Sequence, residues 1–215
     1  MAIEASLTIA VNRIHYPVTS LGPGRRIGVW VQGCTIGCVG CVSTDTWKAD
    51  QSFTTTTTQI LERCKALASG TVEGITISGG EPFQQPEALA ALVAAMRRQW
   101  PAADVLVYSG LPLEVLRRDH ESVLAGCDAV ISDPFDIRRA PGEAWCGSSN
   151  QRLTLLTDLG RRRYRAASES TRRLQVSVEA DGVWFIGVPL PGDLQRVVAA
   201  AARRGVRLGG ASWRA

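Results

Sequence analysis

The sequence predicts an α/β protein in which βα units form a partial, incomplete barrel, followed by a small ββα extension at the C-terminal end. Short apolar runs rich in Val and Ile alternate with segments whose apolar residues recur at the 3.6-residue period of a helix. This alternation is typical of a parallel sheet with crossover helices. A chain of 215 residues with 45% hydrophobic content is long enough for one sizeable core plus an appendage.

Five apolar runs are predicted to be strands of this sheet. They lie at residues 28–31, 74–78, 104–109, 129–132 and 153–156. Between them, residues 59–68 and 86–99 have one apolar face at helical spacing and are predicted to be helices. Pro86 suits the first position of the second helix, where a missing N–H removes no helical hydrogen bond. The threonine run at 54–58 is interpreted as the lead-in to the first helix.

The chain is predicted to divide into a core domain of residues 1–157 and a C-terminal unit of residues 158–215. Many arginines crowd the segment 158–173, which we interpret as a basic linker. Two interpretations of its charge stay open: a solvated segment, or contact with an acidic partner or a phosphate-bearing substrate.

A hairpin and a helix are predicted after this linker. The apolar runs 174–178 and 183–188 flank an Asp-Gly turn. Asp193 is expected to cap the start of the helix and Gly205 to end it. A two-stranded hairpin with one short helix buries too little apolar area to be stable alone. We therefore expect the extension to cover the open side of the barrel, on the substrate side.

Composition restricts the cellular setting. No apolar run approaches the ~20 residues that cross a bilayer, and the N-terminal residues lack a basic region followed by an apolar stretch. We expect a cytoplasmic protein with no membrane partner, and nucleic acid is not expected as a partner at a net charge of +4. Cys64, Cys127 and Cys146 are scattered and are interpreted as buried apolar residues, not as a disulfide framework.

The most informative feature is the run Cys34-Thr-Ile-Gly-Cys38-Val-Gly-Cys41. A closed ferredoxin-type site uses four cysteines, so three thiolates leave one iron of a four-iron cluster without a protein ligand. A structural zinc site would need further ligands nearby, and the two histidines stand at no recognisable spacing. The glycines at 33, 37 and 40 are expected to turn backbone amides toward the sulfurs.

A second motif, Ser78-Gly79-Gly80-Glu81-Pro82, follows the predicted strand 74–78. Its glycines let the chain pass close to a ligand, and Glu81 offers a carboxylate for an ammonium group. The carboxyl ends of parallel strands lie on one rim, so this turn and the cysteine run are predicted to be neighbours. Ser109 and Asp133 end the next two strands and are candidates to contact a ribose or the substrate.

The cysteine run and the Gly-Gly-Glu-Pro turn, about 40 residues apart, resemble the radical S-adenosylmethionine (SAM) enzymes. Further segments are similar to the small activating enzymes of the anaerobic ribonucleotide reductase type, across roughly residues 5–157. These segments are Gly22-Pro-Gly-Arg-Arg, Val31-Gln-Gly-Cys34, Asp45-Thr-Trp47 and Gly147-Ser-Ser-Asn-Gln-Arg152. The last 58 residues carry no motif of that family.

The resemblance implies a [4Fe-4S] cluster on Cys34, Cys38 and Cys41, with SAM chelating the open iron. The implied SAM-binding residues are Gly79, Gly80, Glu81, Pro82, Ser109 and Gly40. At the position of Gly40 the family often has an aromatic residue that packs on the adenine. Trp47 is a candidate to cover part of the site, and the segment Asn150-Gln151-Arg152 is expected to close it. The catalytic residues beyond these ligands are unknown.

The activity implied by the resemblance is reductive cleavage of SAM to a 5′-deoxyadenosyl radical, which abstracts hydrogen from a glycine of a partner glycyl-radical enzyme. A reductant such as flavodoxin or ferredoxin is then a second partner. Two alternatives stay open. One is a radical SAM enzyme that modifies a small molecule or a peptide, and the other is a non-catalytic metal or electron-transfer module.

Overall fold

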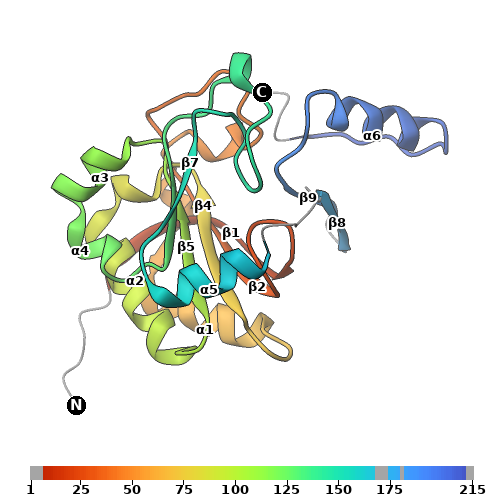
Figure 1. Ribbon diagram of the computed structural model, residues 1–215. Coiled ribbons are helices and arrows are strands. Elements are labelled where there is room, and N and C mark those ends of the chain that lie inside the picture. Colours follow the sequence, from red (N-terminus) through yellow and green to blue (C-terminus); the bar gives the residue numbers. More distant parts are fainter. Residues whose placement is uncertain (1–6, 168–173, 180–181, 212–215) are drawn as a thin grey trace.

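The structure, a computed structural model, describes residues 7–167, 174–179 and 182–211. Its main sheet has seven strands in the order β3-β1-β2-β4-β5-β6-β7 (Figure 1). The central strands are parallel neighbours: β2 (Arg26–Val31), β4 (Gly74–Gly79), β5 (Asp104–Tyr108) and β6 (Ala129–Ser132). The predicted α/β class with a parallel sheet is confirmed.

The edge strands run antiparallel to their neighbours. They are β1 (Thr8–Val18) and β3 (Thr54–Thr56) on one side and β7 (Arg152–Leu155) on the other. The sequence analysis did not predict β1, and it placed β7 in the parallel sheet, which is wrong. The connection from β6 to β7 contains only the short 3-10 turn η4 (Ile137–Arg139) and no crossover helix, so the chain returns in the opposite direction.

One face of the sheet carries the main core. Alternate residues of β2, Ile27, Val29 and Val31, are buried there against apolar residues of the helices. These helices are α1 (Thr57–Leu67), α2 (Pro86–Gln99), α3 (Leu113–Asp119) and α4 (Glu121–Leu124). Thr56 caps α1 by accepting a hydrogen bond from the Gln59 N–H, which explains why the threonine run changes there from strand to helix.

The second face of the sheet is filled at the amino ends of the strands by a buried ion pair. Arg26 Nη2 lies 2.7 Å from Asp104 Oδ2, and both side chains are inaccessible to solvent. The Nε of Arg26 donates to Thr76 Oγ1 on the neighbouring strand at 2.7 Å. A buried charge is tolerated only when paired and hydrogen-bonded, as here.

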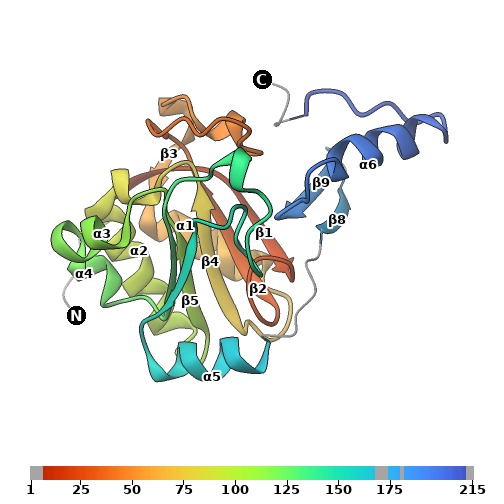
Figure 2. The same cartoon turned by 45° about the horizontal axis from the view of Figure 1, so that its top comes forward.

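Residues 158–166 form a helix and not part of the predicted linker. This helix, α5 (Asp158–Ala166), is capped by Thr157 and crosses the sheet at the end opposite the loop that follows β2 (Figure 2). Tyr164 is buried edge-on against Trp145, with ring centroids 5.2 Å apart, and its hydroxyl donates to Asp104 Oδ2 at 3.2 Å. The arginines misled the prediction because Arg161, Arg162 and Arg165 lie on the exposed face of an amphipathic helix, whereas Arg163 turns inward to Asp104.

The extension contains the hairpin β8 (Leu174–Glu179) and β9 (Gly182–Gly187), followed by α6 (Asp193–Ala202). Gly192, with φ +86°, is the N-cap of α6, so the prediction of Asp193 is wrong by one residue. Asp193 is the first helical residue, and its carboxylate accepts a hydrogen bond from the Leu190 N–H. The rest of the predicted linker, 168–173, lies outside the described residues.

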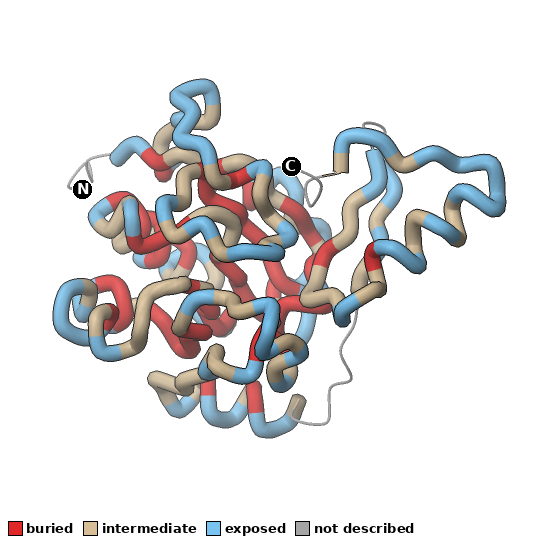
Figure 3. The backbone as a smooth tube through the Cα atoms, turned by 90° about the horizontal axis from the view of Figure 1, so that it is seen from above, coloured by how far each residue is buried: buried red, intermediate tan, exposed pale blue. Residues whose placement is uncertain are grey.

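The hairpin packs on the second face of the sheet beside β1 and β2. Ile186 is buried with Val18, Leu21 and Trp30, and the Ser20 hydroxyl donates to the Ile186 carbonyl at 2.7 Å. Among the described residues of the hairpin Ile186 alone is buried, and α6 is exposed or half-buried along most of its length (Figure 3). Among the described helices, none is long and apolar enough to cross a membrane.

Candidate functional site

The loops that follow β2 and β4 are in direct contact, as predicted from the parallel order of these strands. Gly80 N–H donates to the Val31 carbonyl at 2.9 Å, and Glu81 N–H donates to the Gly33 carbonyl at 2.8 Å. A Cβ atom on Gly80 would lie 2.1 Å from the Gly33 oxygen, so only glycine fits. The Gly-Gly-Glu turn is therefore held against the start of the cysteine run.

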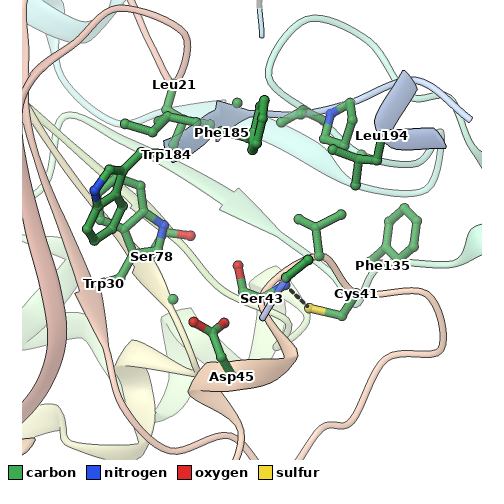
Figure 4. Close-up of a pocket in the computed structure, with 18 of the residues that line it drawn as sticks. Leu21, Trp30, Cys41, Ser43, Asp45, Ser78, Phe135, Trp184, Phe185 and Leu194 are labelled. Atoms are coloured by element: carbon green, nitrogen blue, oxygen red, sulfur yellow. Dashed lines mark hydrogen bonds between the residues drawn. The ribbon is translucent and has the colours of Figure 1, made fainter. Parts of the chain in front are cut away.

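The three clustered cysteines are free, half-buried thiols. Cys41 Sγ accepts a hydrogen bond from the Ser43 N–H at 3.4 Å (Figure 4), and the Trp47 side chain also hydrogen-bonds to it. Cys38 accepts one from the Phe135 backbone. Burial raises the pKa of both thiols, and these hydrogen bonds oppose the rise because they favour the thiolate.

The amide donors to the sulfurs differ from those expected. Gly33 N–H donates to the Thr46 carbonyl at 2.8 Å and not to a sulfur, and the next amide, of Cys34, donates to the Trp47 carbonyl at 2.9 Å. These two bonds fix the start of the loop instead. The positive φ of Gly37 (+63°) and Gly40 (+81°) lets the chain turn twice between the cysteines.

The donor set fits an iron–sulfur cluster. In the described part of the chain, no three His, Cys, Asp or Glu side chains are close enough to share one metal ion. A four-iron cluster makes no such demand, because each thiolate binds a different iron. Three soft thiol ligands with N–H donors around their sulfurs are the surroundings that such a cluster uses.

A cavity of about 660 Å³ joins the two loops to the extension. Eight of the nine predicted site residues line it: Cys34, Cys38, Gly40, Cys41, Gly79, Gly80, Glu81 and Ser109. The ninth, Pro82, is buried at the start of the 3-10 helix η3 (Pro82–Gln84) and does not line the cavity. Phe185 and Leu194 of the extension lie across the cavity from Cys41 and Ser43 (Figure 4).

Glu81 connects the ends of β4 and β5 through its carboxylate. Oε1 accepts hydrogen bonds from the Phe83 N–H at 3.0 Å and the Ser109 hydroxyl at 2.9 Å, and Oε2 accepts from the Gly110 N–H at 2.7 Å. Burial raises the pKa of Glu81, while the three hydrogen bonds oppose the rise. A carboxylate has about four lone-pair sites, so Oε2 keeps one that is not used by these bonds.

Gly40 and Asp133 differ from what their positions suggested. A Cβ atom on Gly40 would lie 2.6 Å from Ile137 Cδ1, so Ile137 fills the space that a larger residue would take. Asp133 has φ +80°, and its carboxylate accepts a hydrogen bond from the Ser132 hydroxyl at 2.8 Å. It does not line the cavity.

The Gly-Ser-Ser-Asn-Gln-Arg segment is organised by Gln151. Its Oε1 accepts a hydrogen bond from the Gly147 N–H at 2.7 Å, and its Nε2 donates to the Asp133 carbonyl at 3.1 Å. Gly147 and Gln151 line the cavity, whereas Asn150 donates to the Pro134 carbonyl and Arg152 is exposed at the start of β7. Only part of this segment therefore reaches the site.

The sequence analysis missed an aromatic and charged wall of the cavity. Arg13 of β1, Trp30 of β2 and Trp184 of β9 all line it. Arg13 forms an ion pair with Asp45, which stands in the motif after the cysteines. No sequence spacing links these four residues. The pairing of β1 with β2 places Arg13 beside Trp30, and the packed hairpin adds Trp184.

The other three cysteines are buried, as predicted. Cys64 and Cys127 are inaccessible to solvent, and burial raises the pKa of each thiol to about 12. Such thiols stay protonated at neutral pH and behave as small apolar groups. Cys146 is also buried, in a cluster with Trp145 and Tyr164.

Comparisons with known proteins agree with this geometry. Residues 20–154 match the model of a family described as "4Fe-4S single cluster domain". The anaerobic ribonucleoside-triphosphate reductase-activating protein of Enterobacteria phage T4 is 30% identical over 139 residues, which are 64% of this chain and 88% of the relative. The protein of the same name from Escherichia coli K12 is 30% identical over 144 residues (64% and 93%). The chain belongs to this family of radical SAM iron–sulfur enzymes.

The activase of Pasteurella multocida is 32% identical over 155 residues, or 66% of this chain and 95% of the relative. The crystal structure of QueE from Escherichia coli is 13% identical, has a TM-score of 0.44 and covers 74% of this chain and 90% of that chain. The family match ends at residue 154, before α5 and the extension. The family match therefore covers the parallel strands and the cysteine loop, but neither β1 nor the extension that lines the cavity.

The raised pKa of Glu81 gives a pH-dependent stability. The folded chain holds the proton more tightly than the unfolded chain, so this residue's contribution is greatest at low pH. It is lost as pH rises from the ordinary pKa, about 4.3, through the raised folded value. Urea unfolding of the cluster-free chain should therefore show wild type losing stability relative to Glu81→Gln across this range. Glu62→Gln, on the exposed side of α1, controls for the lost carboxyl. If the difference in the free energy of unfolding between wild type and Glu81→Gln did not change with pH, the prediction would be wrong.

Proposed function

We propose that this enzyme cleaves SAM reductively and uses the resulting radical to abstract hydrogen from a glycine of a partner glycyl-radical enzyme. One observation supports this proposal most strongly. The three thiols and the Gly-Gly-Glu turn line one cavity, and hydrogen bonds between the two loops hold them together. The relatives are named as activating proteins of an anaerobic ribonucleoside-triphosphate reductase, which favours that class of partner.

In this proposal Cys34, Cys38 and Cys41 hold a [4Fe-4S] cluster. When bound, the cluster supplies one electron to the sulfonium of SAM, which breaks the bond to the 5′ carbon and leaves methionine and the 5′-deoxyadenosyl radical. A flavodoxin- or ferredoxin-type protein would return the electron. The hydrogen bonds to Cys38 and Cys41 stabilise negative charge on the sulfurs and so favour reduction.

The Gly-Gly-Glu turn is proposed to seat the methionyl end of SAM. Gly79 and Gly80 line the cavity and let the turn lie against the backbone of the cysteine loop, and the unused lone pair of Glu81 Oε2 is available to the ammonium group of SAM. Ser109 keeps its proposed place at the ribose side, although its hydroxyl already donates to Glu81 and accepts from the Leu111 N–H. Pro82 then contributes by fixing the turn.

Apolar groups around the cavity favour a protein as the partner. Ten large hydrophobic side chains are exposed among the described residues, and eight of them lie on or beside the cysteine loop or on the extension. Three are Val39, Val42 and Ile137, and five are Val176, Val178, Val183, Leu190 and Val206. Val42, Val183 and Val206 also line the cavity, so this apolar rim is continuous with its interior. Exposed apolar groups gathered at one place mark an interaction surface.

Strand β8 has polar residues on its packed face and valines on its outer face, which supports the same conclusion. Gln175 and Glu179 point to the core, where they contact Pro17 and His15. On the opposite face Val176 and Val178 are 55% and 77% exposed. A hairpin whose outer face meets only water would carry polar residues there. A partner surface that flanks the reactive glycine would cover these valines.

A peptide or a small molecule is the alternative substrate. The cavity volume of about 660 Å³ lies within the range of small-ligand sites. Such an enzyme would cleave SAM productively with its small substrate and would form no radical on a partner protein. The partner experiment below, which measures a glycyl radical on the partner protein, separates this alternative from the activase.

The cluster assignment predicts a sharp difference between cysteines. Cys38→Ala should lose the iron and the SAM cleavage measured with dithionite, because the cluster would keep only two protein ligands. Cys64→Ala is the matched control and should keep both, since Cys64 is buried in α1. Equal iron content in the two variants would remove the basis of the proposal.

The apolar rim predicts a defect confined to the partner. Val178→Asp should lower the yield of glycyl radical on an anaerobic ribonucleotide reductase at least tenfold, because it places a charge in the apolar contact. Cleavage of SAM without the partner should not change. Leu67→Asp places the same charge on α1, away from the rim, and should have no effect. Equal radical yields from the two variants, measured by electron paramagnetic resonance (EPR), would show that the rim is not the docking surface.

A further inference from the structure

Arg13 lies between two indole rings in the wall of the cavity. Its Cζ is 5.8 Å from the centroid of Trp30 and 5.7 Å from the centroid of Trp184. Its guanidinium binds the Asp45 carboxylate with both terminal nitrogens, at 2.5 and 3.4 Å. A cation near an aromatic face is attracted by the ring quadrupole, and the attraction is stronger when the pair is desolvated. The Arg13 side chain is only 18% exposed.

The extension determines where Trp184 lies. His15, two residues after Arg13 on β1, stacks on Trp184 with centroids 6.1 Å apart. His15 Nδ1 also pairs with Glu179 Oε1 of β8 at 3.0 Å. Both strands of the hairpin therefore hold Trp184 against β1, and removal of the hairpin would leave Arg13 with one indole only.

Asp45 connects Arg13 to the cysteine loop. It lies four residues after Cys41, and both residues line the same cavity. Its carbonyl accepts a hydrogen bond from Gln32 Nε2 at 3.2 Å, which ties it to the residue that follows β2. Adding an electron to a cluster on these thiols adds negative charge next to Asp45. The positive charge of the Arg13 guanidinium offsets that repulsion.

We propose that Trp184 of the extension is a positioning residue that raises the reduction potential of the cluster by holding Arg13 on Asp45. This inference rests on the proposed function in requiring a cluster on Cys34, Cys38 and Cys41. The two effects are thermodynamically linked. Packing of the extension on β1 raises the reduction potential of the cluster, and reduction of the cluster in turn favours the packed extension. The part of the chain outside the family match thereby acts on the redox centre.

The test is an EPR-monitored redox titration of the full, cluster-loaded chain with dithionite and mediators. Arg13→Gln should lower the potential, because Asp45 is no longer offset, and Asp45→Asn should raise it. Trp184→Ala should lower it by less than Arg13→Gln, and Trp184→Phe should restore most of the shift by keeping an aromatic face. In an Arg13→Gln background, Trp184→Ala should add no further shift.

Arg196→Gln is the matched control, since Arg196 pairs with Asp193 on α6 and is mostly exposed. It removes the same charge from the extension and should leave the potential unchanged. Two results would overturn the proposed role of Trp184 while leaving the proposed function intact. One is an unchanged reduction potential in Trp184→Ala, and the other is a shift by Trp184→Ala that is equally large in wild type and in the Arg13→Gln background. A wild-type chain that binds no iron and sulfide would instead overturn both the proposed function and the role of Trp184.

Discussion

The contact between the loops after β2 and β4 is the constraint on which the site depends. Parallel pairing of the two strands brings the loops side by side, and Gly80 permits the close approach that a side chain would prevent. The Glu81 N–H then bonds the Gly33 carbonyl, while the Glu81 carboxylate reaches β5 through Ser109 and Gly110. One short turn thus holds the cysteine loop and three strand ends in a fixed relation.

The second face of the sheet explains why the cavity lies at this rim. The buried pair of Arg26 and Asp104 fills the amino ends of the strands, and α5 covers it through Tyr164. The open volume is left at the carboxyl ends, where the hairpin packs over Trp30. The extension is therefore a wall of the cavity, and it leaves its own apolar face exposed beside the opening.

The sequence predicted the parts of the fold that have strong local signals. Apolar runs located β2, β4, β5 and β6, and the order of parallel strands placed the two motifs together. It did not reveal β1, whose Arg13 and His15 break the apolar pattern because they face the cavity and the extension, while Asn12 donates to the Gln32 side chain. The helix α5 was not predicted because its many arginines resemble a linker. The contact of Arg13 with Trp184 could not be predicted because it depends on tertiary packing.

The central claim is that SAM binds the iron left open by the three thiols, within the cavity that the two loops share. The most direct measurement is the EPR spectrum of the reduced, cluster-loaded chain before and after addition of SAM. The account predicts a changed spectrum, because a new ligand on the open iron alters its electronic surroundings. A spectrum that stays the same at saturating SAM would contradict it.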